Sequence, residues 1–127
     1  MSAMTACAAA SSTEAGGLEP AKAVDGDPTT RWSSAYSDQQ WIYLDLGRTY
    51  TIDKVRLSWE TAYAKKYQIQ LSTDANTWTT VYQDDAGNGG VDDIALAGRS
   101  ARYVKMYAWQ RGTPWGYSLW EFAVSGY

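Results

Sequence analysis

The sequence predicts an all-β fold, an antiparallel β-sandwich or jelly roll, and two observations lead to this prediction. Apolar and polar residues alternate with a period of two in several segments, which is the pattern of strands that bury one face. Turn-rich gaps separate these segments, and no stretch longer than a turn or two has the 3.6-residue apolar stripe of a helix. Short strands with turn signals every eight to twelve residues are typical of sandwiches and jelly rolls.

The expected strands follow one another along the chain, and each places its apolar side chains on one face. These apolar faces are Ile42, Leu44 and Leu46; Val55, Leu57 and Trp59; Tyr67, Ile69 and Leu71; and Val104, Met106 and Ala108. The segment SLWEFAVSGY closes the chain with the same alternation. The stretch LEPAKAVDG, residues 18–26, is suited to one short helix.

The composition describes one folded domain with an unusual share of Trp and Tyr. The chain has 127 residues, of which 45% are hydrophobic and 20% charged, enough for a core that needs no disulfides. It contains seven Trp and ten Tyr but a single Phe. Because Trp and Tyr combine an apolar body with a polar tip, they suit surfaces that bind a ligand in water. We expect some in the core and others on such a surface.

Several classes of function are disfavoured by charge and composition. The net charge is −3, and the basic residues never cluster beyond the pair Lys65 and Lys66, so nucleic-acid binding is not expected. No apolar stretch approaches the length of a membrane span, and the start, MSAMTACAAASS, lacks the regions of an intact signal peptide. With Cys7 as the single cysteine, no internal disulfide can form. We expect Cys7 to be a small, semi-buried apolar residue.

Function in a β-sandwich is expected in the loops at its ends. Four loops, residues 11–19, 23–40, 60–66 and 109–118, are rich in aromatic and charged side chains. Those side chains belong to Glu14, Glu19, Arg31, Tyr36, Gln39, Glu60, Tyr63, Lys65, Trp109, Arg111, Trp115 and Tyr117. Such loops differ from the Ser, Asn and Lys mixture of turns that only connect strands.

Catalysis is disfavoured by the residues that the chain lacks. The sequence has no histidine, which removes the Ser-His-Asp and Cys-His schemes and the usual zinc ligand sets. The adjacent acids at 84–85 and 92–93 point to opposite faces of a strand, so we expect solvated hairpin acids there. Glu14 and Glu60 are a conceivable glycosidase pair, but loop tips on a compact sandwich give a shallow site. The expectation is therefore a binding domain and not an enzyme.

The loop residues favour a carbohydrate ligand. Sugars place apolar C–H patches against aromatic rings, and their hydroxyls bond to arginine and carboxylate groups. Insertion of exposed aromatics into a membrane is an alternative, but the acids in the same loops disfavour an anionic surface. The stretch AVDGDPTTRW adds a separate question, because Asp25, Asp27 and Thr30 place three oxygen-bearing side chains within six residues. They form either a solvated acidic turn or part of a site for a hard cation.

A run of motifs resembles the discoidin, or coagulation factor V/VIII type C, superfamily. The motifs are ASSTEAGGLEPAKAVDGDPTTRWSS, QWIYLDLG, TIDKVRLSWE, YQIQLSTDANTW, ARYVKMYA and YSLWEFAVSG. Within that superfamily the chain is similar to carbohydrate-binding module family 32 of secreted bacterial hydrolases. The resemblance implies a jelly roll of about eight strands over residues 9–127, with residues 1–8 as an N-terminal extension or linker remnant. It also implies a secreted, extracellular and monomeric module attached to a hydrolase.

The resemblance further implies a structural Ca²⁺ site. The implied ligands are main-chain oxygens of Lys22 and Trp120, the side chains of Asp25, Asp27 and Glu121, and both oxygens of Thr30. Six or seven hard oxygens, three of them on carboxylates, suit Ca²⁺. This set would join an early loop to the last strand.

Closer still, the chain is similar to the tandem discoidin domains of bacterial chitosanase/glucanases, which bind chitosan. Their sugar-contacting positions match Glu14, Arg31, Tyr36 and Glu60 here. Possible rim residues are Tyr63, Lys65, Trp109, Trp115 and Tyr117, of which the last two are equally suited to packing the loop. Family members that bind galactose often use a histidine, which this chain lacks. The resemblance to the chitosan-binding domains therefore makes chitosan the expected ligand. A galactoside, a β-glucan or a lipid surface is the alternative, and a tandem copy of the module is an expected partner.

Overall fold

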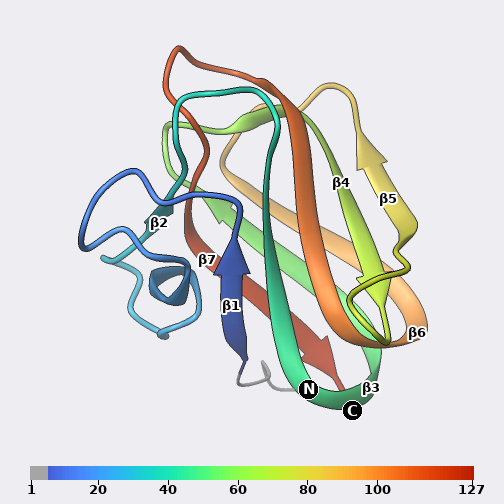
Figure 1. Ribbon diagram of the computed structural model, residues 1–127. Helices are drawn as coiled ribbons and strands as arrows, with labels where there is room; N and C mark the ends of the chain where they lie inside the picture. The colour runs from blue at the N-terminus through green and yellow to red at the C-terminus, as the bar shows by residue number, and fades with distance from the viewer. Residues whose placement is uncertain (1–5) are drawn as a thin grey trace.

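The computed structural model describes residues 6–127, which form seven β-strands and one 3-10 helix (Figure 1). The elements are β1 (Cys7–Ala10), η1 (Pro20–Ala23), β2 (Trp32–Ser33), β3 (Gln40–Trp59), β4 (Ala64–Ser72), β5 (Thr79–Asp84), β6 (Val91–Arg111) and β7 (Ser118–Gly126). The expected short helix is present as η1, with Pro20 at its start and Ala23 buried. In this part of the chain no helix is long and apolar enough to cross a lipid bilayer.

Two long strands, β3 and β6, each run through both layers of the sandwich. The first part of β3 pairs with β1 and with the second part of β6, which in turn pairs with β4. From Tyr50 onward, β3 pairs with β7 and with the first part of β6. The β3–β6 register shifts between Asp45 and Tyr50, and such irregularities bend paired strands from one layer into the other.

The predicted antiparallel β-sandwich is confirmed, because every described strand pair is antiparallel. We expected about eight strands, and residues 6–127 contain seven. Both β3 and β6 continue through the bend without interruption. Each therefore counts as one strand while it supplies a segment to both layers.

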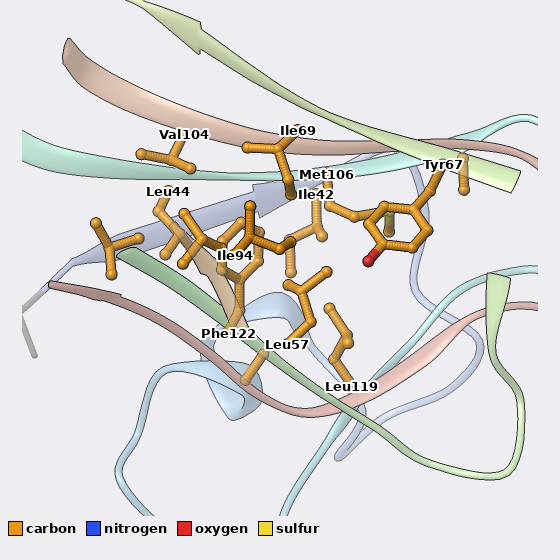
Figure 2. Packing of buried hydrophobic residues seen from close by; sticks show 14 of the residues in the cluster. Ile42, Leu44, Leu57, Tyr67, Ile69, Ile94, Val104, Met106, Leu119 and Phe122 are labelled. Carbon is orange, nitrogen blue, oxygen red and sulfur yellow. The ribbon is translucent and has the colours of Figure 1, made fainter. Parts of the chain in front are cut away.

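The core fills the space between the two layers, as Figure 2 shows. All four predicted apolar faces are buried, and none of their side chains is more than 5% exposed. Trp32 of β2 and Tyr117, just before β7, are fully buried as well. Period-two alternation therefore identified the buried face of each of these strands correctly.

The N-terminal edge differs from one expectation. Cys7 opens β1 and pairs with Asp45 of β3, and its side chain is exposed. The expected semi-buried Cys7 is therefore wrong, because its position in β1 leaves the thiol outside the core. Cys7 and Ala8, which we assigned to the extension, both lie in this strand.

The acid pair at the start of β6 also differs from expectation. Asp92 is half-buried and accepts hydrogen bonds from the indole nitrogen of Trp59, at 3.0 Å, and the hydroxyl of Tyr67, at 2.6 Å. Burial and the Asp92 carboxylate raise the pKa of the Tyr67 phenol. Asp93 points to the other face, where Arg56 donates to it at 2.7 Å. The expectation of a solvated acid is wrong for Asp92, because its carboxylate accepts hydrogen bonds from two buried side chains.

Asp92→Ala is expected to destabilise the fold far more than Asp93→Ala. Removing Asp92 leaves the Trp59 and Tyr67 donors without their acceptor, at a cost of about 1–3 kcal/mol for each unsatisfied group. Removing Asp93 breaks an exposed ion pair worth about 0–1 kcal/mol. Urea unfolding of both variants measures the difference, and equal losses of unfolding free energy would contradict it.

Candidate functional site

The four residues matched to the sugar-contacting positions line one hollow at an end of the sandwich. This loop hollow has a volume of about 340 Å³, and it is lined by Glu14, Arg31, Ser33, Tyr36, Glu60, Thr61, Ala62 and Trp115. Figure 1 shows the loops after β2, β3 and β6 meeting at the upper end of the molecule. The fold thus brings together residues that are up to 101 positions apart, from Glu14 to Trp115.

Short backbone hydrogen bonds fix where these residues leave the sheet. The Glu14 amide donates to the Ser33 carbonyl at 2.8 Å, which ties the loop 11–19 to β2. The Glu60 amide donates to the Ser118 carbonyl at 3.0 Å, at the point where β3 ends and β7 begins. Arg31 directly precedes β2. Three strand ends therefore hold the acids and the arginine of the hollow.

The Arg31 guanidinium is held by two hydroxyls. Its Nη1 donates to Ser33 Oγ at 2.9 Å and to Ser118 Oγ at 2.8 Å. The buried Ser118 hydroxyl donates in turn to the Trp32 carbonyl at 2.7 Å. Within residues 6–127 no carboxylate lies within 4 Å of this guanidinium, so pairing with a loop acid does not occur. Because arginine carries five N–H donors, some remain for a ligand.

The two acids of the hollow have different neighbours. The Glu14 carboxylate lies beside the Tyr36 hydroxyl and raises the pKa of that phenol. Tyr36 is 55% exposed, so its ring is accessible from solvent. One oxygen of Glu60 accepts the Ala62 amide at 2.8 Å, which fixes its carboxylate against the start of the next loop. Glu60 is half-buried and is thus more constrained than a solvated strand end.

The possible rim residues separate into three groups. Trp115 lines the loop hollow and is 48% exposed. Tyr63 lines a neighbouring hollow instead. Lys65 and Trp109 line neither hollow, and the Trp109 ring stacks on Tyr107 with 6.1 Å between ring centroids.

Tyr117 is not a rim residue. Its side chain is fully buried, and its hydroxyl donates to the Asp38 carbonyl at 2.5 Å. The ring therefore packs the loop from inside, which is the alternative that the sequence left open. This correction has a physical reason, since Tyr117 immediately precedes β7 and points into the core.

The residues matched to a Ca²⁺ site converge around the Thr30 hydroxyl. That hydroxyl lies 2.5 Å from Asp25 Oδ2, 3.1 Å from the Asp27 carbonyl and 3.4 Å from the Lys22 carbonyl. Burial raises the pKa of Glu121, and the nearby charges of Asp25 and Asp27 raise it further. The last strand therefore faces the acidic turn, as the implied ligand set requires.

The chemistry of this donor set fits a hard cation. Every matched donor is an oxygen, and the three carboxylates repel one another unless a positive charge lies between them. Asp25 and Asp27 instead accept hydrogen bonds from Thr30 and Thr29. Over the described residues, no three Asp, Glu, His or Cys side chains are already gathered at metal-binding distance.

Sequence reasoning missed the serines that support the site. Ser33 and Ser118 hold Arg31, and Thr61 and Ala62 complete the wall beside Glu60. Ser118 lies 87 residues from Arg31, so no local pattern could have paired them. There were only weak grounds in the sequence for including Thr61 and Ala62, namely that they follow Glu60 in the same loop and loops often supply several residues to one site.

Comparisons with known proteins agree with this geometry. The family model of the F5/8 type C domain matches residues 7–122. Chitosan-binding module 1 of a chitosanase/glucanase from Paenibacillus sp. IK-5 is 50% identical, with 97% of this chain and 96% of that chain covered and a TM-score of 0.93. Module 2 of the same enzyme, solved in complex with chitotriose, is 49% identical, with 97% and 98% covered and a TM-score of 0.92.

Two more distant relatives belong to other systems. CpGH89CBM32-5 from Clostridium perfringens, solved with GalNAc-β-1,3-galactose, is 25% identical, with 97% of this chain and 99% of that chain covered and a TM-score of 0.85. The polysaccharide lyase 8 family protein HylA of Enterococcus faecalis is 35% identical over 103 residues, which is 76% of this chain. The chain spans 7% of the length of that relative. These findings confirm the resemblance seen in the motifs: the chain belongs to the F5/8 type C, or discoidin, domain family.

Proposed function

We propose that this chain is a non-catalytic carbohydrate-binding module whose loop hollow binds the end of a chitosan chain. The observation that carries the proposal is the meeting of Glu14, Glu60 and Arg31 in one open hollow beside exposed aromatic rings. Support comes from the two chitosan-binding modules of Paenibacillus sp. IK-5, which match this chain over nearly its whole length.

Charge explains why an amino sugar suits this hollow. Glucosamine carries an amine that is largely protonated in mild acid, and a carboxylate is its natural partner. A hydrogen bond to a charged group contributes about 1.5–3 kcal/mol. Glu14 and Glu60 would accept from the ammonium, and Arg31 would donate to sugar hydroxyls. The exposed Tyr36 ring would cover the C–H face of the sugar.

The position of the hollow suits a tethered module. In Figure 1 β7 ends at the bottom of the molecule, and the loops after β2, β3 and β6, which form part of the hollow, lie at the top. A hydrolase joined at that lower end would leave the hollow facing the polysaccharide. A shallow site predicts weak affinity, so a tandem copy of the module would add avidity. We also propose a secreted, extracellular setting, because chitosan is an extracellular polymer.

Chitotriose is expected to bind at least about tenfold more tightly than its fully N-acetylated counterpart, because acetylation removes the ammonium that Glu14 and Glu60 would accept from. Isothermal titration calorimetry near pH 6 measures both affinities. Equal affinities would contradict the amino-sugar assignment and favour a neutral glycan. Release of shorter sugars during prolonged incubation would contradict the non-catalytic assignment.

Glu14→Gln is expected to weaken chitotriose binding about tenfold, since the amide keeps the shape of the side chain but loses its charge. Glu19→Gln is the matched control, because Glu19 lies in the same loop and does not line the hollow. Its affinity should equal that of the parent protein. A similar loss in both variants would show a general charge effect and remove Glu14 from the site.

We also propose that Lys22, Asp25, Asp27, Thr30, Trp120 and Glu121 hold a structural Ca²⁺ ion. The proposal rests on the all-oxygen donor set and on the three mutually repelling carboxylates. The ion would stabilise the acidic turn that ends at Arg31, and so the entry of the chain into β2. Its role would be structural, since these residues do not line the loop hollow.

Glu121→Gln is expected to change the melting temperature in opposite directions with and without calcium. In EGTA the variant should melt at or above the parent protein, because a half-buried charge that faces Asp25 and Asp27 is gone. In Ca²⁺ at 100 times its Kd the parent protein should gain about 2.7 kcal/mol, and the variant, which lacks one ligand charge, should gain less. Differential scanning calorimetry measures both, and a melting temperature of the parent protein that calcium does not change would contradict the site.

A further inference from the structure

A second hollow lies directly beside the loop hollow and shares part of its wall. The second hollow has a volume of about 460 Å³. Its lining includes Trp59, Glu60, Thr61, Tyr63, Asn88 and Trp120. Glu60 and Thr61 line both hollows, so a ligand that passes over these two residues occupies both.

We propose that the second hollow is a subsite for the next sugar of the same chain. The proposal rests on the function proposed above, and it adds that the module grips at least two consecutive sugar units. Glu60 is the pivot of this arrangement, because its carboxylate forms a wall between the two units. Each unit of chitosan carries an amine, and a carboxylate at this shared wall can bond to the ammonium group of a unit in either hollow.

The Tyr63 ring provides a fixed aromatic surface in the second hollow. A Cβ atom at Gly112 would lie 2.3 Å from Tyr63 Cε2, so the ring rests directly on the Gly112 backbone. Gly89 contacts the same side chain, where a Cβ would lie 3.4 Å from Cδ1. Contact with these two glycines orders the half-buried ring and leaves part of it exposed. A ring that is already ordered loses little entropy when a sugar packs against it.

The other walls are equally constrained. The Trp59 indole donates to Asp92 at 3.0 Å, and the Trp59 amide donates to the Gly90 carbonyl at 2.8 Å. The second bond ties the loop between β5 and β6 to the end of β3, and Asn88 of this loop lines the same hollow as Thr61. Glu60 is the one charged residue in the lining. The second hollow therefore combines the Tyr63 and Trp120 side chains, an amide and one carboxylate, which suits an amino sugar.

The two hollows together predict that affinity depends on chain length. Glucosamine fills the loop hollow alone, whereas chitobiose reaches both hollows. Because the second unit adds a contact with the Tyr63 ring, chitobiose should bind about three- to tenfold more tightly than glucosamine, a difference of about 0.6–1.4 kcal/mol.

The test compares glucosamine and chitobiose affinities in the parent protein and four variants by NMR titration. In Tyr63→Ala the gain from monomer to dimer should disappear while monomer affinity stays unchanged. Tyr63→Phe keeps the ring and should retain the gain. Gly112→Ala should lose it, because the added methyl displaces the ring. Tyr107→Ala is the matched control, since Tyr107 is a half-buried tyrosine outside both hollows.

Each outcome has a definite meaning. Equal monomer and dimer affinities in the parent protein would overturn the subsite and leave the proposed function standing. Absence of binding to both sugars would overturn the proposed function itself. If Tyr63→Ala weakens the affinities for glucosamine and chitobiose by the same factor, the subsite is overturned. Tyr63 would then act in the first site or only in stabilising the fold. If Tyr63→Ala loses the gain in affinity from glucosamine to chitobiose but still binds glucosamine as the parent protein does, the result supports two subsites.

Discussion

The loop hollow depends above all on the hydrogen bonds of one buried residue, Ser118. Its amide donates to the Ala62 carbonyl at 2.8 Å, and its carbonyl accepts the Glu60 amide at 3.0 Å. Its hydroxyl accepts from Arg31 and donates to the Trp32 carbonyl. One serine thus sets the relative positions of the arginine and of the acid-bearing loop. Because Ser118 begins β7, the last strand of the sandwich organises a site whose charged groups all come from the first half of the chain.

The Trp and Tyr residues have three roles: some pack the core, some cover an outer sheet face, and others line the hollows. Trp32, Tyr67 and Tyr117 are fully buried. A second group covers an outer sheet face, where the Lys105 ammonium lies 4.0 Å from the Trp78 ring centroid and burial lowers the pKa of that amine. This group comprises Trp41, Tyr43, Trp78 and Tyr103. The aromatic excess therefore reflects packing on both sides of a layer, and ligand contact accounts for a smaller share than composition indicated.

The fold followed from the sequence because alternation records burial residue by residue, so Ile42 or Leu57 could be assigned to a face without their partners. Discoidin-type motifs brought the matched site residues to notice, and the structure places all four in one hollow. The roles of Asp92 and Ser118 could not be predicted, because their partners lie 25 to 87 residues away. Local patterns carry no information about such pairings. The bend that joins the layers in β3 likewise depends on a cross-strand register.

An amide chemical-shift map during titration with chitotriose tests most directly whether the loop hollow is the glycan site. The largest shifts should fall on Glu14, Arg31, Glu60 and Ala62, whose backbone lies at the hollow. The aromatic face around Lys105 should stay unchanged. Shifts concentrated on that face, with the loop amides unmoved, would contradict the assignment of the site.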